Sequence, residues 1–220
     1  MTTTARIEHL ITAGTFSLDG GTWEVENNVY LLGDDQEVLI IDPAHDAEAV
    51  AQQVGDRQVL GILLTHGHDD HIREVFEVQR KVGGRIHLNP ADHVLWEQVH
   101  AHALPEVEIS DGDVFTISDT RLTAIHTPGH SPGSTCFYAE DLPHTDGSRG
   151  SVLFSGDTLF QGGPGATGRS HSSFETIIES IRDQIFTKLP ENTEVHPGHG
   201  DSTRIQSEKP HLQEWVDRGH

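Results

Sequence analysis

Short apolar runs bounded by glycine, proline and aspartate make up the first third of this chain. Residues 7–32 have a strand-like pattern with breaks at Gly14 and at residues 19–21, where Asp19-Gly20 is a hairpin-type turn signal. The runs at 37–41 and 59–64 are continuous and partly β-branched, which is typical of buried strands. The pattern therefore predicts successive antiparallel strands that begin one sheet.

Apolar residues at helical spacing follow these strands, and a second group of strands lies between residues 106 and 156. The predicted helices are residues 46–55 with Asp46 as the N-cap, 72–82, 91–102, 172–189, and a last helix that Pro210 opens. The polar residues 141–150 predict an irregular loop. Two strand groups, each followed by helices, favour two sheets face to face with helices outside. No linker divides residues 1–220, which indicates one domain.

Charge and composition limit the classes of molecule that we expect this chain to bind. The chain has 14 basic and 35 acidic residues and a net charge of -21, which argues against a nucleic acid or an anionic membrane surface and leaves a small molecule. No run approaches the roughly 18 apolar residues of a membrane span, and residues 1–19 lack a secretory signal pattern. We therefore expect a cytoplasmic location, and a homo-oligomer stays open. The single cysteine, Cys136, excludes an intramolecular disulfide and a cysteine-rich zinc site.

A dense cluster of polar residues, THGHDDH (residues 65–71), follows the apolar run at 59–64. The pattern H-x-H-x-D-H supplies three imidazoles and a carboxylate within six residues, a ligand set that suits zinc or iron. It lies where a strand ends and a loop begins, the usual place for a site held by a rigid scaffold. A solvated, histidine-rich turn is the alternative. The candidate ligands in this cluster are His66, His68, Asp70 and His71.

Three further segments each present one candidate ligand after a strand. His130 lies in TPGHSPG, Asp157 in FSGDTLF and His199 in HPGHG. Proline and glycine on both sides of a histidine make a stiff loop that displays the side chain instead of packing it on an apolar face. Together with the first cluster, four separate segments offer seven candidate metal ligands.

Asp42 and His45 follow the strand at 37–41. Asp42 ends a buried strand, so it either orients a metal ligand or closes the strand by accepting backbone hydrogen bonds. The sequence leaves these two roles open. His45 lies just beyond Asp42, and we expect it at the surface, with a loop that faces the site as the alternative.

In order and in local sequence, the motifs THGHDDH, TPGHSPG, FSGDTLF and HPGHG strongly resemble those of the metallo-β-lactamase-fold hydrolase superfamily. The resemblance covers nearly the whole chain and includes every ligand position. It implies an α/β fold, the αββα sandwich, with a dinuclear site between the sheet edges. Carried over by position, it implies a first metal ion on His66, His68 and His130, a second on Asp70, His71 and His199, and Asp157 as the bridge.

The resemblance implies two divalent metal ions, zinc in the first place, with iron or manganese accepted by the same nitrogen and oxygen ligands. Two cations about 3.5–4 Å apart need several neutral imidazoles and a carboxylate able to bridge them. Their charge lowers the pKa of a shared water, which then attacks near neutral pH. Asp70 or Asp157 would accept its proton, and no serine or cysteine nucleophile is needed.

Within the superfamily, THGHDDH and the GDTLF motif with its glycine-rich continuation look most like glyoxalase II. The long form of that enzyme has a helical C-terminal domain that recognises glutathione, whereas only residues 200–220 follow His199 here. Short bacterial members, including actinobacterial ones that use mycothiol, are nearer in length. We therefore expect hydrolysis of a thioester of a low-molecular-weight thiol, such as an S-hydroxyacyl or S-formyl conjugate.

Other activities of the superfamily are the alternatives to thioester hydrolysis. Persulfide dioxygenases share the fold and bind one iron, which here would use His66, His130 and Asp157. A lactonase would use the same hydrolytic machinery as a thioesterase. Secreted β-lactamases are disfavoured by the missing signal pattern, and those with a cysteine ligand are excluded because Asp157 occupies the bridging position.

The segment between Asp157 and the following helix is the expected path of the substrate. Arg169 lies in this segment, and cations are scarce in the chain. We therefore expect Arg169 to contact a polar or anionic part of the substrate, with a surface arginine that balances nearby acids as the alternative. His171 is a second candidate for substrate binding.

Overall fold

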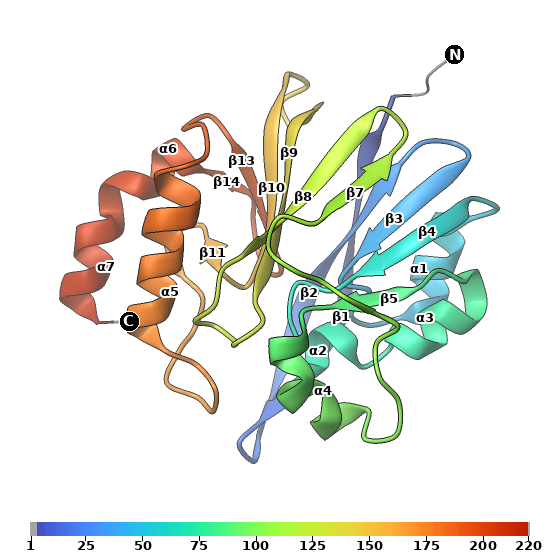
Figure 1. Ribbon diagram of the computed structural model, residues 1–220, viewed down its shortest axis with the longest axis horizontal. Coiled ribbons are helices and arrows are strands. Elements are labelled where there is room, and N and C mark those ends of the chain that lie inside the picture. The colour runs from blue at the N-terminus through green and yellow to red at the C-terminus, as the bar shows by residue number, and fades with distance from the viewer. Residues whose placement is uncertain (1–3, 220) are drawn as a thin grey trace.

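The strands of the chain form two six-stranded sheets that pack face to face, with helices on both outer sides (Figure 1). The structure, a computed structural model, describes residues 4–219. Helices from the first half of the chain lie beside one sheet, and helices from the last quarter, drawn in orange and red, lie beside the other.

The first sheet contains the strands of the N-terminal half. Its order is β1 (Arg6–Leu18), β2 (Gly21–Gly33), β3 (Glu37–Ile41), β4 (Gln58–Leu63), β5 (Ile86–Leu88) and β6 (Val107–Glu108). β1, β2 and β3 are antiparallel, as the turn at Asp19-Gly20 predicts. From β3 to β6 the neighbouring strands are parallel, so the chain returns through crossovers that carry helices.

Short helices cover the outer face of the first sheet. They are α1 (Ala47–Val54), α2 (Asp69–Ile72), α3 (Val75–Val82), the 3₁₀ turn η1 (Pro90–Asp92) and α4 (His93–Val99). Asp46 caps α1 as predicted, because its carboxylate accepts a hydrogen bond from the Ala49 N–H at 3.0 Å. One buried apolar cluster joins the sheet to these helices; its members include Val29, Leu31, Ile40, Ile62, Val50, Val78 and Trp96.

The second sheet contains the strands of the C-terminal half. Its order is β14 (Thr203–Arg204), β13 (Glu194–Pro197), β10 (Arg149–Gly156), β9 (Thr135–Pro143), β8 (Thr120–His126) and β7 (Val114–Ile117). β10 and β13 are parallel, and the other neighbours are antiparallel. A two-stranded ribbon, β11 (Leu159–Phe160) with β12 (Gly163–Pro164), follows β10.

Helices on the outer face of the second sheet complete the fold. They are α5 (Phe174–Ser180), its π-helical continuation η2 (Ile181–Phe186), α6 (Ile205–Glu208), the 3₁₀ turn η3 (Lys209–His211) and α7 (Leu212–Arg218). Their apolar side chains share a buried cluster with the sheet: Leu153, Val195, Ile177, Ile181 and Trp215. A third cluster lies between the sheets, with Leu32, Leu39 and Leu63 against Leu122, Phe137 and Phe154. The predicted αββα sandwich is therefore confirmed.

The helices predicted at 72–82, 91–102 and 172–189 are each shorter or broken. The first is split into α2 and α3 beside Arg73, whose guanidinium donates a hydrogen bond to Thr15 Oγ1 on β1 at 2.7 Å. α4 ends at Val99, and α5 becomes π-helical from Ile181. Contacts with other parts of the fold set these boundaries, and apolar spacing along the chain does not show them.

The loop predicted at 141–150 is confirmed only for residues 144–148, because strands occupy both ends of the segment. β9 continues to Pro143 and β10 begins at Arg149, so the segment is a β-hairpin. The Glu194 carboxylate on β13 accepts a hydrogen bond from the Thr145 N–H at 3.0 Å. This long-range contact orders a turn whose polar composition alone favours irregular structure.

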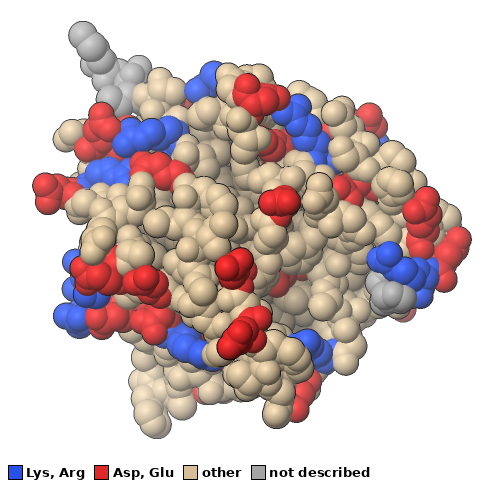
Figure 2. Space-filling view, turned by 180° about the vertical axis from the view of Figure 1, so that it is seen from behind, with Lys and Arg blue, Asp and Glu red and all other residues tan. Residues whose placement is uncertain are grey.

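Basic side chains lie mostly beside acidic ones on the face shown in Figure 2. Surface ion pairs of the molecule include Arg6 with Asp35 at 2.7 Å and Arg204 with Asp146 at 2.6 Å. The charge on this face is therefore locally paired and forms no broad basic field. Within residues 4–219, each helix is too short or too polar to span a lipid bilayer.

Candidate metal centre

The four ligand-bearing segments leave strands at one edge of the sandwich. β8, β10 and β13 run in the same direction, because β9 is antiparallel to β8 and β10 while β13 is parallel to β10. Their carboxyl ends lead to His130, Asp157 and His199, and β4 of the other sheet ends just before His66. The fold thus brings the side chains of four distant segments to one place.

His66, His68 and His130 form a first group of buried imidazoles, whose ligand atoms lie within 4.8 Å of one another. His68 Nδ1 and His130 Nε2 are 2.9 Å apart. Two imidazole nitrogens at this distance need a proton or a cation between them, because their lone pairs otherwise repel. The three side chains are those that the resemblance assigns to the first metal ion.

Asp70, His71 and His199 form a second group, again with ligand atoms within 4.8 Å of one another. His199 Nε2 lies 3.3 Å from Asp70 Oδ2 and 3.3 Å from His71 Nε2. Asn27, on β2, donates a hydrogen bond from its amide to Asp70 Oδ2 at 3.0 Å. Asn27 was not predictable from local sequence, because its partner Asp70 lies 43 residues away along the chain.

Asp157 lies between the two groups. Its Oδ1 is 3.5 Å from His71 Nε2, and its Oδ2 is 3.5 Å from His130 Nε2 and 3.4 Å from His199 Nε2. One carboxylate therefore faces imidazoles of both groups, which is the arrangement that a bridging ligand requires.

Two glycines allow this close packing. Gly156 has φ +49°, a conformation that favours glycine, and it turns the chain from β10 directly into Asp157. At Gly198 a Cβ would lie 2.3 Å from Asp157 Oδ1 and 2.8 Å from His71 Cε1. A side chain at Gly198 would therefore fill the space beside the cluster.

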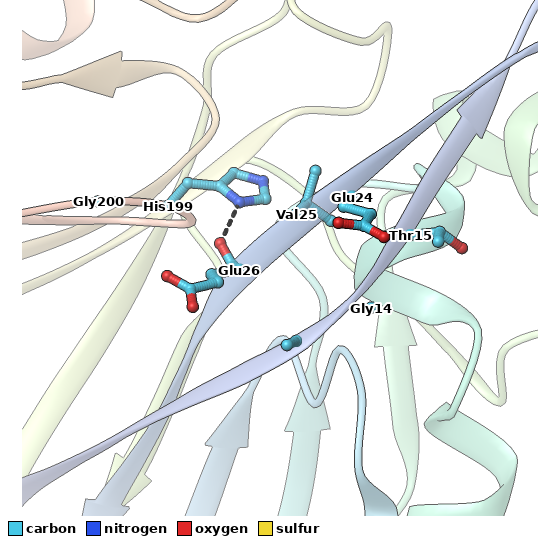
Figure 3. Close-up of a pocket in the computed structure, with 8 residues that line it drawn as sticks. Gly14, Thr15, Glu24, Val25, Glu26, His199 and Gly200 are labelled. Carbon is cyan, nitrogen blue, oxygen red and sulfur yellow. Dashed lines mark hydrogen bonds between the residues drawn. The ribbon is translucent and has the colours of Figure 1, made fainter.

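Hydrogen bonds on the opposite ring nitrogens orient the imidazoles. His130 Nδ1 lies 2.8 Å from the Ala166 carbonyl, and His199 Nδ1 lies 2.7 Å from the Glu26 carbonyl, the contact drawn in Figure 3. A carbonyl only accepts, so each Nδ1 carries a proton and each Nε2 faces the cluster, where its lone pair can bind a cation once no proton occupies it. This is the tautomer that a metal ligand needs.

Asp42 orients two of the ligands, so both roles left open for it apply. Its Oδ2 lies 2.9 Å from His71 Nδ1 and accepts a hydrogen bond from Thr65 Oγ1 at 2.6 Å, and its Oδ1 accepts one from the Thr65 N–H at 2.7 Å. The Thr65 hydroxyl in turn lies 3.0 Å from His66 Nδ1. Asp42 therefore closes the strand and fixes the rings of His66 and His71.

The donor atoms of the cluster fit a metal. His66 Nε2 and Asp157 Oδ1 are buried and have no hydrogen-bond partner among the described residues. Buried polar atoms without a partner are rare in folded proteins because each costs desolvation free energy. Neutral imidazoles combined with carboxylates are the donor set preferred by zinc, iron and manganese, and a divalent cation at each group would satisfy these atoms.

Burial and neighbouring charges shift histidine pKa values of the two groups in opposite directions. In the first group, burial lowers the pKa of His66 well below its usual value and that of His68 to about 3, so both rings are neutral. In the second group, burial opposes protonation, but the neighbouring carboxylates raise the pKa of His71 to about 9 and that of His199 to about 11. The metal-free second group therefore holds protons that a cation would displace.

The comparisons with known proteins agree with this geometry. The sequence profile of the Metallo-beta-lactamase superfamily matches residues 22–199. This chain belongs to the metallo-β-lactamase superfamily. Hydroxyacylglutathione hydrolase GloC of Haemophilus influenzae is 32% identical over 84% of this chain and 90% of its own length.

Two solved structures of the superfamily show the same fold. BLEG-1, a B3 metallo-beta-lactamase, has a TM-score of 0.69 and 29% identity, and the match covers 91% of this chain and 98% of BLEG-1. TTHA1623 in a di-iron-bound form has a TM-score of 0.69 and 27% identity, with 90% and 96% covered. The family and the two ligand groups support a metal-dependent hydrolase with divalent metal ions.

A further buried carboxylate, Asp92, lies beside the first ligand group, and the local sequence did not indicate its role. Asp92 is fully buried and accepts hydrogen bonds from the Gly67 N–H at 2.7 Å, from Ser131 Oγ at 2.7 Å and from the Gly133 N–H. Gly67 lies between His66 and His68, and Ser131 follows His130, so Asp92 connects the two loops of the first group. Its position at the start of a predicted helix gave no signal of this role.

His45 is not at the surface, so that prediction is wrong. Its side chain is buried, with 5% of its surface exposed. Its ring packs against Gly14 on β1, where a Cβ would lie 2.4 Å from the imidazole. The missing side chain at Gly14 makes room for the ring, which a local pattern around His45 cannot show.

A small cavity opens beside the cluster. Its volume is about 140 Å³, and it is lined by Phe16, Val25, His68, Asp70, His130, Asp157, Ala166, Arg169, Ser172 and His199. Arg169 therefore lies where the sequence analysis placed it, at the cavity of the candidate site. His171 does not line this cavity: it is exposed, with φ +68°, in a turn closed by the Ser172 N–H and the Arg169 carbonyl. The substrate-binding role of His171 stays a prediction.

The protonated second group predicts how the stability of the metal-free protein depends on pH. The pKa values of His71 and His199 are raised in the folded state, so their stabilisation is complete below the unfolded value near 6.5. It is lost as pH rises through about 9 and then 11. We expect the free energy of unfolding to fall above pH 6.5, by up to about 1.4 kcal/mol per pH unit for each group.

Thermal melts of chelator-treated protein from pH 6.5 to 9 test this expectation. The melting temperature should fall by roughly 3–5 °C per pH unit for one group. Protein loaded with zinc should show a much flatter profile, because the cation takes the place of the protons. Equal slopes with and without zinc would contradict a metal at the second group.

Proposed function

We propose that this chain is a dinuclear metal-dependent hydrolase that cleaves a thioester of a low-molecular-weight thiol. The observation that carries the proposal is Asp157, whose two carboxylate oxygens face imidazoles of both ligand groups at 3.4–3.5 Å. A bridged pair of ligand groups suits two cations and the hydrolytic chemistry that such pairs support. The similarity to GloC, a hydroxyacylglutathione hydrolase by name, favours a thioester as the bond that is cleaved.

The residues that would hold the metal ions are His66, His68 and His130 for the first, Asp70, His71 and His199 for the second, and Asp157 for both. When bound, the cations supply Lewis acidity and lower the pKa of water at the site. Zinc is the proposed metal, and iron or manganese would use the same donor atoms.

Asp70 and Asp157 are the groups proposed to accept a proton during hydrolysis. Burial opposes their ionisation, but the imidazolium of His71 beside Asp70 and that of His199 beside Asp157 lower both pKa values, that of Asp70 to about 2. Both carboxylates are therefore ionised at neutral pH in the metal-free protein, which is the form that can bind a cation. Asn27 holds Asp70 in place through its amide, which restricts the carboxylate to one orientation.

The shape of the site suits a small acyl group on a longer thiol. The cavity that the ligands share is about 140 Å³, well below the roughly 300–1,000 Å³ of pockets for larger ligands. An open groove of about 950 Å³ begins at His199 and Val25, which line both spaces, and runs along β1 and β2 (Figure 3). The acyl group and sulfur would occupy the cavity, and the remainder of the thiol would follow the groove.

Thioester hydrolysis by the purified, metal-loaded protein tests the proposal. The substrates are S-lactoyl and S-formyl conjugates of glutathione and of mycothiol, assayed beside O₂ uptake with a thiol persulfide and hydrolysis of a β-lactam and a lactone. We expect turnover of a thioester that is abolished by chelation and restored by zinc. O₂ uptake with the persulfide, or cleavage of the β-lactam or lactone without cleavage of any thioester, would overturn the proposal.

A further inference from the structure

The guanidinium of Arg169 lies on a platform of two aromatic rings. Its Cζ is 4.0 Å from the centroid of the Trp23 ring and 4.8 Å from that of Phe16. Phe16 and Trp23 face each other across β1 and β2, with their rings stacked at 5.7 Å. Cation–π contacts of this kind fix the position of an arginine side chain without using its hydrogen-bond donors.

A second contact holds the loop that contains Arg169 and Ser170 against the hairpin formed by β1 and β2. Asp19, in the turn of the hairpin, accepts hydrogen bonds from the Ser170 N–H at 2.9 Å and from Ser170 Oγ at 2.6 Å. The Asp19 carboxylate is thus bound to Ser170. Arg169 directly precedes Ser170, so this contact also holds the Arg169 backbone in place. The aromatic platform then fixes its side chain.

The Arg169 guanidinium has no hydrogen-bond or close ion-pair partner in the part of the chain that the structure describes, and the Asp19 carboxylate acts on its charge only at longer range. Its guanidinium makes no hydrogen bond or ion pair within residues 4–219, and Nη1 is buried without an acceptor. The contrast with other basic residues is clear, since acids outnumber bases by 35 to 14 in this chain and Arg57, for example, pairs with Glu8 at 2.7 Å. A buried N–H without an acceptor is costly, so an external acceptor at Nη1 would be strongly favoured.

The unpaired guanidinium lines the cavity of the metal centre. Arg169 borders the same cavity as His68, His130 and Asp157. The Phe16 ring lies between Arg169 and the metal centre. It is under the Arg169 guanidinium, and its centroid is 5.3 Å from that of the His68 ring. A group bound to Arg169 would therefore lie close to a substrate atom at the metal centre.

We propose that Arg169 binds a carboxylate of the substrate and selects thioesters that carry this group near the scissile bond. The inference rests on the proposed function, because it names a part of that substrate. The planar fork of a guanidinium matches the two oxygens of a carboxylate. A phosphate is larger and more highly charged, and the small cavity also contains the carboxylates of Asp70 and Asp157. These features favour the smaller, singly charged anion.

Two thioesters that differ in one group test this assignment. They are the S-lactoyl esters of 3-mercaptopropionate and of 3-mercaptopropionamide, which have the same length but differ in charge. For the metal-loaded protein we expect kcat/KM to be about 10- to 100-fold higher for the acid, the range that charge-assisted hydrogen bonds supply. In the R169Q variant the ratio of acid to amide should approach one, and in R169K it should be intermediate.

The control is R182Q, which removes an exposed arginine paired with Asp183 at 2.7 Å on the outer helix. Its ratio of acid to amide should equal that of the wild type. A wild-type ratio near one would overturn the assignment. An R169Q variant that keeps the wild-type ratio, even with lower activity and a lower melting temperature, would show a structural role for Arg169 and would also overturn it.

A binding measurement separates this inference from the proposed function. The indole N–H signal of Trp23, under Arg169, is followed by NMR while 3-(methylthio)propionate or its amide is added to the metal-loaded protein. The acid should shift the signal of Trp23, but not those of the buried Trp96 and Trp215, and R169Q should abolish the shift. A shift without thioester hydrolysis would overturn the proposed function and retain the carboxylate site, and no shift would overturn the site.

Discussion

Replacing Asp157 by asparagine is expected to lower thioester turnover by at least about 1000-fold, which corresponds to about 4 kcal/mol. The same variant should bind about one divalent cation per chain or fewer, compared with two in the wild type. Metal analysis of the purified protein and hydrolysis of the preferred thioester measure the two effects. Among single substitutions, we expect this one to have the largest effect.

The expectation follows from the place of Asp157 between the ligand groups. The side chain is 11% exposed, and its oxygens face His71, His130 and His199 at 3.4–3.5 Å. Asparagine keeps the shape but removes the negative charge, and it would direct an amide N–H₂ toward at least one imidazole. A neutral bridge cannot balance two cations that lie close together, so the second cation should be lost first.

The matched control is D183N, which makes the same chemical change at an exposed residue paired with Arg182. We expect wild-type metal content and turnover in this variant, because surface ion pairs contribute little. A D157N variant that still binds two cations per chain would contradict the bridging role, whatever its activity.

Replacing Asp92 by asparagine is expected to give the second largest effect, although the hydrogen bonds that Asp92 accepts come from Gly67, Ser131 and Gly133 and not from a ligand side chain. The free energy of unfolding should fall by about 2–3 kcal/mol, because a buried acceptor of three hydrogen bonds becomes half donor. This corresponds to a decrease of roughly 5–10 °C in melting temperature for a chain of this size. The affinity of the first metal site should fall by about 10- to 100-fold.

The physical reason is the connection that Asp92 makes between two loops. Its Oδ2 accepts from the Gly67 N–H and from Ser131 Oγ, and its Oδ1 accepts from the Gly133 N–H. Asparagine keeps one oxygen, so its amide N–H₂ must face at least one of these donors. The loops that carry His68 and His130 would then lose their common anchor.

Thermal melts of the metal-free protein and a chelator competition assay for zinc measure the two effects separately. The control is E97Q on α4, an exposed position a few residues away that loses the same charge. It should leave both quantities unchanged. A D92N variant with wild-type stability and wild-type zinc affinity would contradict the anchoring role.

The ligand positions were predictable from the sequence because each one follows a strand. A strand pattern fixes where its loop begins, and β4, β8, β10 and β13 each lead directly to a candidate ligand. The resemblance then assigned these residues to two metal ions, and the structure brings all seven of them together. The glycine and proline residues around His130 and His199 supported the assignment, since they predicted stiff loops.

The groups around the ligands were less predictable, because their partners are distant in the sequence. Asp92 accepts hydrogen bonds from residues 25, 39 and 41 positions away, and Asn27 donates to Asp70 from 43 positions away. An aspartate at a helix start and an asparagine in a strand have ordinary local explanations. Only the packed fold shows that Asp92 holds two ligand loops together.

The predictions of helix boundaries and of an exposed His45 were wrong for a related reason. The break between α2 and α3 lies beside Arg73, which bonds to Thr15 on β1, and His45 is buried because Gly14 on the same strand leaves space. Both outcomes depend on β1, which is far from these residues along the chain. Apolar periodicity indicates which face of a segment is buried. It does not indicate which hydrogen-bond partners or free space a neighbouring element offers.

Stepwise addition of zinc to metal-free protein, with thioester hydrolysis followed at each step, tests the central claim most directly. The claim is that two cations, bridged by Asp157, support hydrolysis by this chain. We predict that the rate rises with added zinc and levels off at two equivalents per chain. A rate that levels off at one equivalent, or that does not depend on added metal, would contradict a dinuclear hydrolase.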